Sequence, residues 1–363
     1  MVRLSELVIA AVFGISASAA CGQAVPAESA DGPYKVVKSA KVGGEGGFDY
    51  VAADPDSRHL YVVRSGQAGR ISAYDMDTLK LAGEIPNVSG GHGVAVDPKT
   101  GHAFSSSSPV VMFDSKTLAV IKTIPVEGRP DGIFLEPSTE RVYVLSHRAP
   151  HVTAINTADG TIAGTFDLGG SPEEGVADGK GHAYICVEDK AQVAVVDCKA
   201  LKTTAHYDLG AKGGQPAGLS MDPANNVLFV YCRTAKNCLV LDAADGKLLA
   251  TLPTGSGVDA AEFNPQTMES FCSAGDGKLT VIKETSPTSF AVEQNVTTKS
   301  GAKCSTLDSK TGRIYLITAE RGAAPAAQAA GQGGERRGGG RRGGGRRGGA
   351  MVPGSFTILV VGK

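Results

Sequence analysis

The chain contains no Trp, and it lacks the short motifs by which several enzyme classes are recognised. It has no Gly-x-Ser-x-Gly elbow, no phosphate-binding loop and no His-Glu-x-x-His helix. Its seven Cys include no Cys-x-x-Cys pair, which argues against a structural zinc knuckle, a thioredoxin-like site and covalently attached haem. Hydrolases with a nucleophile elbow, P-loop nucleotidases and zincin proteases are therefore set aside.

A repeat with a period of 39 to 44 residues runs along most of the chain. Each copy has an acidic residue, or Asn in one copy, usually followed by Pro, with an aromatic residue about seven positions later. Seven copies are present: Asp54-Pro55 with Tyr61, Asp97-Pro98 with Phe104, Glu136-Pro137 with Tyr143, Asp178-Gly179 with Tyr184, Asp222-Pro223 with Phe229, Asn264-Pro265 with Phe271, and Asp308-Ser309 with Tyr315. Seven copies indicate seven structural units.

The interior of each copy is typical of short strands. In the first copy, residues 61–64 and 71–75 are β-rich runs separated by a Gly-containing turn, and no window keeps the apolar spacing of a long helix. A unit of this length with about four strands is the signature of a β-propeller, whose blades are too small to bury their own faces. We therefore expect an all-β, seven-bladed propeller of four-stranded blades.

The last copy is one strand short. After Tyr315 only one further strand remains, at residues 355–361, whereas residues 34–43 resemble the segments that complete other copies. If residues 34–43 pair with the last blade, the ring closes and no sheet edge is left exposed. The sequence thus predicts a propeller over residues 34–363, preceded by a linker at 22–33.

The first 21 residues fit an export signal. They hold an Arg, an apolar run from Leu7 to Ile15 that is too short to span a bilayer, and small residues that end at Cys21. The run Ala17-Ser18-Ala19 suits an ordinary signal peptidase, whereas residues 18–21 form a lipoprotein box without its usual aliphatic residue. Both routes place the mature protein in the periplasm or outside the cell, in the second case lipid-anchored through Cys21.

Export makes disulfides feasible. The best candidate pair is Cys232 with Cys238, because a hairpin centred on Ala235 would place them directly opposite each other, with Cα atoms about 4.5–5.5 Å apart. The alternative interpretation is that both are small buried hydrophobic residues.

The repeat phase identifies the residues at one end of the central channel, where propellers usually bind ligands. Five positions before each marker, or four in the fourth copy, the chain enters the innermost strand. Glu174 is preferred to Glu173 there because Glu174-Gly175 matches Asp131-Gly132. The residues at this position are Asp49, His92, Asp131, Glu174, Ala217, Asp259 and Lys303.

Four carboxylates and a His around one channel mouth would repel one another unless a cation, a basic ligand or Lys303 neutralised them. The carboxylates suit a hard divalent cation, and His92 favours a transition metal. Ala217 is expected to leave an opening in this set. Three interpretations stay open at this point: polar strand ends in a wet channel, ligand binding without chemistry, and catalysis.

Two further groups lie in hairpins on the same face. His147 and His151 flank one hairpin and are expected to face each other, although two ligands alone make a weak metal site and surface histidines are the plainer interpretation. Arg64, Arg148 and Arg233 occupy corresponding hairpins, where they either meet an anionic ligand or stay solvated.

The net charge of −1 conceals a basic segment at residues 321–354, which carries seven Arg and one Glu. This Gly- and Ala-rich insert is predicted to be disordered and to lie between the second and third strands of the last blade. It resembles RGG segments that bind nucleic acid, but it has no interleaved aromatic residues, and export favours envelope polymers, lipid headgroups or extracellular DNA as partners. A passive insertion without a partner is the alternative. The paired arginines are Arg336, Arg337, Arg341, Arg342, Arg346 and Arg347.

The strand sequences resemble one family of propellers. An aromatic-Val strand at residues 61–63, the strand Val193-Ala194-Val195-Val196-Asp197, and Asp77-Thr78-Leu79-Lys80 are similar to the YVTN-repeat, YncE-like propellers of bacteria and archaea, over residues 34–363. Without Trp, the chain lacks the Trp-bearing repeat motifs of WD40 propellers and of many quinoprotein dehydrogenases. The resemblance implies the fold, which serves binding, adhesion and catalysis alike.

Together these observations predict an exported, monomeric binding protein of the cell envelope, without a transmembrane span. Its ligand, a small molecule or an envelope protein, would be held at the acidic channel mouth, with a divalent cation as the cofactor that the residues suggest. One alternative is a metal-dependent hydrolase or lyase at the same mouth, as in lactonase-type propellers. The other is a nucleic-acid or polyanion binder that works through the insert.

Overall fold

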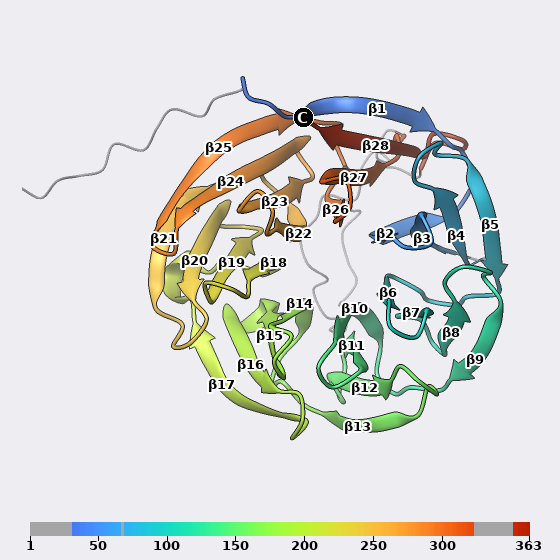
Figure 1. The fold of residues 1–363 in the computed structure, drawn as a ribbon, viewed down its shortest axis with the longest axis horizontal. Helices are drawn as coiled ribbons and strands as arrows, with labels where there is room; N and C mark the ends of the chain where they lie inside the picture. The colour runs from blue at the N-terminus through green and yellow to red at the C-terminus, as the bar shows by residue number, and fades with distance from the viewer. Residues whose placement is uncertain (1–30, 67–68, 323–350) are drawn as a thin grey trace, which may run out of the picture.

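Seven four-stranded antiparallel sheets stand around a central axis as the blades of a propeller (Figure 1). The structure is a computed structural model that describes residues 31–66, 69–322 and 351–363. Its described residues are almost entirely β, with two single-turn 3-10 helices, η1 (Glu188–Lys190) and η2 (Gly210–Lys212). The all-β, seven-bladed fold predicted from the repeat is confirmed.

Six blades consist of four consecutive strands, which follow one another from the channel outward. The first is β2 (Gly47–Asp54), β3 (His59–Ser65), β4 (Arg70–Asp75) and β5 (Leu81–Pro86), and the second is β6 (Val94–Asp97), β7 (His102–Ser105), β8 (Val110–Asp114) and β9 (Val120–Ile124). The third is β10 (Pro130–Glu136), β11 (Arg141–Ser146), β12 (Val152–Asn156) and β13 (Ile162–Phe166), and the fourth is β14 (Pro172–Ala177), β15 (His182–Val187), β16 (Gln192–Asp197) and β17 (Lys202–Asp208). The fifth is β18 (Pro216–Asp222), β19 (Val227–Cys232), β20 (Asn237–Asp242) and β21 (Leu248–Pro253), and the sixth is β22 (Val258–Asn264), β23 (Glu269–Ala274), β24 (Lys278–Ser286) and β25 (Ser289–Thr297).

The seventh blade joins the two ends of the chain. It contains β26 (Cys304–Asp308), β27 (Arg313–Thr318) and β28 (Thr357–Gly362), and its outermost strand is the N-terminal β1 (Lys35–Lys41). Strands β1 and β28 are antiparallel, with Lys35 opposite Gly362 and Lys41 opposite Thr357. The predicted closure of the ring is confirmed, and the outer edge of β28 is covered.

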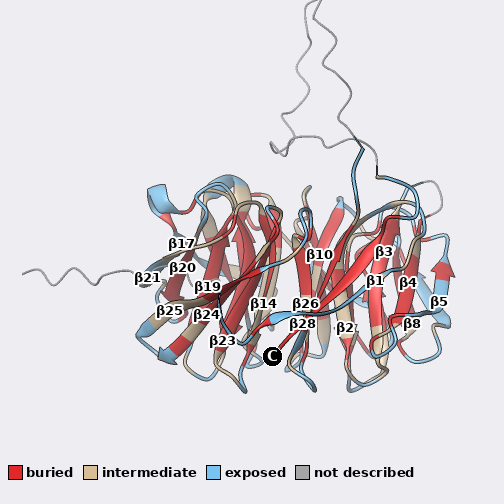
Figure 2. Ribbon diagram, turned by 90° about the horizontal axis from the view of Figure 1, so that it is seen from above, coloured by how far each residue is buried: buried red, intermediate tan, exposed pale blue. Residues whose placement is uncertain are grey.

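The apolar core lies between the blades. The described residues form seven buried clusters, and each combines side chains from two neighbouring blades. In Figure 2 second and third strands such as β3, β4 and β19 are mostly buried, whereas the outermost strands carry many of the exposed residues. A blade is therefore stable only against its neighbours, as expected for units of about 40 residues.

The repeated aromatic residues connect one blade to the next. Burying one such side chain contributes roughly 1.5–3 kcal/mol, and these side chains are all buried. The hydroxyl of each Tyr among them also donates a hydrogen bond to a backbone carbonyl of the following blade: Tyr61 to Ser115, Tyr143 to Cys198, Tyr184 to Ala243, and Tyr315 to Met76. The repeated acid ends the inner strand, where its carboxylate accepts backbone N–H groups of the turn, as Asp54 does from Asp56.

The flanks of the Arg-rich insert lie where the repeat phase predicts. The chain leaves β27, Arg321 forms an isolated bridge with Met351, and β28 follows. These flanks place residues 323–350, which lie outside the described residues, between the second and third strands of the seventh blade. Among the described residues, the structure has no helix with the length and apolar character needed to cross a membrane.

Candidate functional site

The channel mouth lies at the end of the propeller where the inner strands begin. Asp49, Asp131 and Asp259 stand near the starts of β2, β10 and β22, and Lys303 directly precedes β26. Because neighbouring strands are antiparallel, the hairpins that join second to third strands lie at this same end. Gly47, at the start of β2, pairs with Ser65, the last residue of β3. Side chains from both kinds of loop can therefore meet at the mouth.

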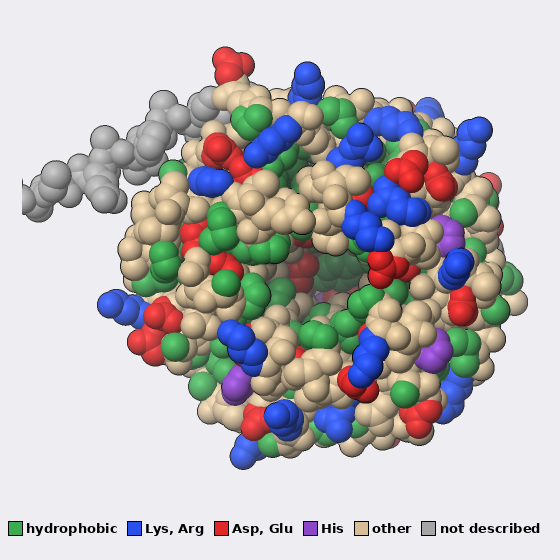
Figure 3. Space-filling model, viewed as in Figure 1, with side chains coloured by type: hydrophobic (Ala, Val, Ile, Leu, Met, Phe, Trp, Pro, Cys, Tyr) green, Lys and Arg blue, Asp and Glu red, His purple; other side chains and the backbone are tan. Residues whose placement is uncertain are grey.

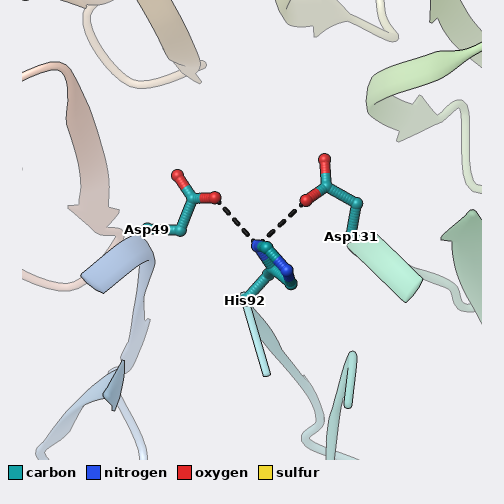
Figure 4. Close-up of side chains that lie close together, drawn as sticks. All are labelled: Asp49, His92 and Asp131. Atoms are coloured by element: carbon teal, nitrogen blue, oxygen red, sulfur yellow. Dashed lines mark hydrogen bonds and ion pairs between the residues drawn. The ribbon is translucent and has the colours of Figure 1, made fainter. Parts of the chain in front are cut away.

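The first half of the site links neighbouring blades through ion pairs. Lys303 Nζ contacts a carboxylate oxygen of Asp259 and lies 3.2 Å from Asp49 Oδ1. Asp49 Oδ2 is 2.9 Å from His92 Nδ1, and the same nitrogen is 3.0 Å from Asp131 Oδ1 (Figure 4). His92 thus lies between two carboxylates that come from the blades on either side of it.

The second half closes the circle. Asp131 Oδ2 is 3.0 Å from His147 Nε2, which lies 3.9 Å from Glu173 Oε1. Glu173 Oε2 is 3.4 Å from Arg233 Nη2, and the same nitrogen contacts Asp259 Oδ1. The series of contacts thus ends at Asp259, the carboxylate at which it began.

We call these eight side chains the mouth ring, since acidic and basic groups alternate around it. All seven blades contribute at least one member, and the third contributes two. The members are Asp49, His92, Asp131, His147, Glu173, Arg233, Asp259 and Lys303. The repulsion expected among the carboxylates is opposed by attraction, because each of them contacts basic side chains.

The ionisation of the ring follows from these contacts. Burial alone would lower the pKa of His92, but its hydrogen bonds with Asp131 and Asp49 outweigh burial and raise the pKa to about 9. The Asp131 carboxylate likewise raises the pKa of His147. Although burial would raise the pKa of Asp131, the two histidines hold it well below the ordinary range. His92 is therefore positively charged at neutral pH.

The basic members and Asp49 are the more accessible part of the ring. Their side chains are 23 to 40% exposed. Three of the carboxylates beneath them, on Asp131, Glu173 and Asp259, are only 4 to 12% exposed, while that of Asp49 is 26% exposed. A molecule that approaches the mouth therefore meets N–H donors as well as the expected carboxylates.

Five of the residues chosen from sequence lie in the ring, but Glu174 does not, so the choice of Glu174 over Glu173 was wrong. Pro172 pairs with the end of β15 as Pro130 pairs with the end of β11, and each is followed by a ring acid. Glu173 is therefore equivalent to Asp131. Glu174 accepts hydrogen bonds from the backbone N–H groups of Leu219, at 2.6 Å, and Ala261, at 3.0 Å, inside the channel.

The hairpin residues behave differently from the sequence-based expectations. His147 and His151 do not face each other, since His147 joins the ring and His151 Nδ1 lies 3.2 Å from Asp167. Arg233 is not a solvated charge. It reaches the ring from the hairpin of the fifth blade and so supplies the charge that Ala217 lacks, while a further ion pair joins it to Glu188 at 2.9 Å.

Arg64, in the corresponding hairpin of the first blade, is fully buried rather than solvated. Its guanidinium lies 4.0 Å above the centre of the Phe356 ring and donates hydrogen bonds to the Glu45 carbonyl.

The repeat phase places Arg233 and His147 in hairpins at the channel face, but it does not show that their side chains reach the ring. One feature of the sequence could have identified Arg233 as a ring member: Ala217, at the ring position of the same blade, has no charge.

The predicted Cys232–Cys238 pairing is wrong. The hairpin turn is one residue shorter than expected, so that Cys232 pairs with Asn237, and Cys238 pairs with Tyr231. Cys232 packs between the fourth and fifth blades, whereas Cys238 packs between the fifth and sixth, on the opposite face of the sheet. All six described cysteines are buried free thiols. Cys21 and the paired arginines at 336–347 lie outside the described residues.

Three overlapping groups, formed by ring members and, in one case, the neighbouring Cys304, carry donor atoms of the kinds that bind metals. Within the described residues these are Asp49, His92 and Asp131; Asp131, His147 and Glu173; and Asp49, Asp259 and Cys304, with donor atoms no more than 4.8 Å apart in each group. The first two combine imidazole and carboxylate ligands, which suit a divalent transition metal. Lys303 and Arg233 already neutralise Asp49, Glu173 and Asp259, so a cation is not required to hold the ring together.

Comparisons with known proteins show the fold alone. No protein-family model and no curated protein matches the chain. The crystal structure of RRP9 WD40 repeats has a TM-score of 0.69 at 11% identity, covering 93% of this chain and 99% of that one. The structure of U3-55K has a TM-score of 0.67 at 11% identity, covering 90% and 98%. The chain therefore has the WD40-like propeller fold, although it lacks Trp, and its placement among YVTN-repeat propellers stays a prediction.

Proposed function

We propose that this protein is an exported binding protein of the cell envelope, which holds an anionic group of its ligand or partner at the mouth ring. The observation that carries the proposal is the ring itself: every blade delivers a charged side chain to one closed circle at the centre of one face. Its basic members are accessible, with Lys303 40% exposed and Arg233 27% exposed. Export rests on the sequence of residues 1–21.

Binding would proceed by exchange of ion pairs. An incoming carboxylate or phosphate would take over N–H groups of Lys303 and His92 that now face the ring acids. Because partners and ring are both charged, the interaction should be selective for geometry and sensitive to salt. Arg233 pairs with three carboxylates, so it would keep its position in the ring while the ligand binds.

The test compares two lysine variants of the full chain. Citrate serves as the small probe and a short poly-glutamate peptide as a mimic of a partner surface, with calorimetry at low and high salt. Lys303→Gln should weaken binding about tenfold, the effect of losing one charge-assisted hydrogen bond. Lys310→Gln is the matched control, because Lys310 forms an exposed pair with Asp56. Equal binding by both variants, or no binding by the unmodified chain, would overturn the proposal.

A metal-dependent hydrolase is the second candidate, and one observation favours it. His92 Nδ1 lies about equally far from Asp49 Oδ2 and Asp131 Oδ1, at 2.9 and 3.0 Å, and one N–H cannot point at both. A divalent ion that displaced the proton from His92 Nδ1 could be shared by all three groups. Metal analysis of the purified protein decides this point: a stoichiometric metal that is lost in His92→Ala supports the enzyme, and its absence removes this candidate.

A further inference from the structure

A cavity of about 250 Å³ lies below the mouth ring, inside the channel. Its wall begins at the residues that follow the ring members along the inner strands, from Tyr50 and Gly93 to Ala260 and Ser305. Figure 3 shows the central hollow of the propeller with acidic and hydrophobic side chains around it. At roughly 30 Å³ for each water molecule, the cavity has room for about eight waters or one small organic molecule.

Two carboxyl groups in the wall, on Glu174 and Glu262, have no basic partner. Glu174 Oε2 accepts the two backbone N–H groups described above, and Glu262 Oε2 accepts the hydroxyl of Ser305 at 3.1 Å. In the part of the chain that the structure describes, neither forms an ion pair, whereas every carboxylate of the mouth ring does. Burial raises the pKa of Glu174 well above its ordinary value and that of Glu262 to about 8. The cavity therefore offers two acidic groups that lack a counter-ion and whose protonated form is favoured, so an entering cation would displace a proton from each carboxyl group.

The rest of the wall determines which cation would fit. Hard metal ions need about six or more oxygen ligands in place, but much of this wall is aliphatic, including Val51, Val96 and Ile133. Tyr50 adds an aromatic ring, which can attract an organic cation. An alkyl chain that ends in ammonium groups matches both kinds of surface.

We propose that this cavity binds a small organic cation with one or two primary ammonium groups, which Glu174 and Glu262 meet with their carboxylates. The inference rests on the proposed function, because it takes the channel as the route by which a ligand is held. It also adds a second binding site of opposite preference: the ring binds an anionic group, and the cavity below it binds a cationic group.

The first test uses the unmodified chain, so it does not depend on the folding of any variant. Binding of 1,4-diaminobutane is compared with that of 1,4-butanediol, which has the same length but no charge. The diamine should bind at least tenfold more tightly than the diol. Equal affinities, or tighter binding of Ca²⁺ than of the diamine, would overturn the inference.

The second test locates the site. Glu262→Gln keeps the size of the side chain and an acceptor for Ser305, and it should weaken diamine binding about tenfold. Glu320→Gln is the control, because Glu320 is exposed and pairs with Lys41. Diamine binding that is equal in both variants would place the amine elsewhere and refute the inference. Citrate binding without diamine binding refutes the cavity site alone, and the reverse result refutes only the ring proposal.

Discussion

Asp259→Asn is the substitution that tests the mouth ring as a stabilising network. The Asp259 side chain is 4% exposed and contacts both Arg233 and Lys303. Breaking a buried ion pair by removing one partner costs about 3–5 kcal/mol. Arg233 keeps Glu188 and Glu173, Lys303 keeps Asp49, and both cations are partly exposed, so we discount this range. We expect a loss of about 2–3 kcal/mol in the free energy of unfolding, from a total of roughly 5–15 kcal/mol.

Urea denaturation followed by circular dichroism measures this loss, since the chain has no Trp to serve as a fluorescent probe. Asp56→Asn is the matched control: Asp56 pairs with Lys310 at 2.6 Å, but both side chains are more than half exposed. That variant should lose less than about 0.5 kcal/mol. The double variant Asp259→Asn, Lys303→Met should recover part of the lost free energy of unfolding. The second substitution removes the Lys303 cation, which the first leaves with fewer partners. A gain in stability in Asp259→Asn would mean that repulsion among carboxylates dominates the ring, and would refute the reasoning.

Three further predictions concern closure, pH and the insert. Deleting residues 34–43 removes β1 and uncovers β28, so the truncated chain should aggregate; a soluble truncation with an unchanged Tm would contradict the closure energetics. His92 has its pKa raised from 6.5 to about 9, so its stabilising contribution is complete below pH 6.5 and is lost as the pH rises through about 9. The Tm of the unmodified chain should therefore fall more steeply than that of His92→Gln over this range, and parallel curves would argue against a charged His92. Replacing residues 323–351 with a short Gly-Ser turn should leave the Tm unchanged and abolish binding to heparin at low salt; retained heparin binding would show that the insert is not the polyanion site.

Much of the architecture could be predicted from the sequence, because a repeat carries its own phase. An acid, or Asn in one copy, at the end of the inner strand and a Tyr or Phe about seven residues later define one blade, and seven copies define the ring. The same phase identified Asp49, His92, Asp131, Asp259 and Lys303 as neighbours, although 254 positions separate the first from the last. A backbone position at the start of an inner strand faces the channel whatever residue occupies it, so counting along the chain was sufficient.

The remaining details depended on tertiary structure. Glu173 stands five positions before Asp178, the spacing found in the other copies, and one residue along the strand decides whether an acid joins the ring or the cavity, since successive side chains of a strand point in different directions. The same sensitivity separates Cys232 from Cys238, because a turn shorter by one residue places them on opposite faces of a blade. Arg233 joins the ring because a long side chain from one blade can cross to acids of its neighbours. The repeat determined where each blade begins. Which charged side chains form ion pairs depends on the distances between blades, and these distances cannot be predicted from a local sequence pattern.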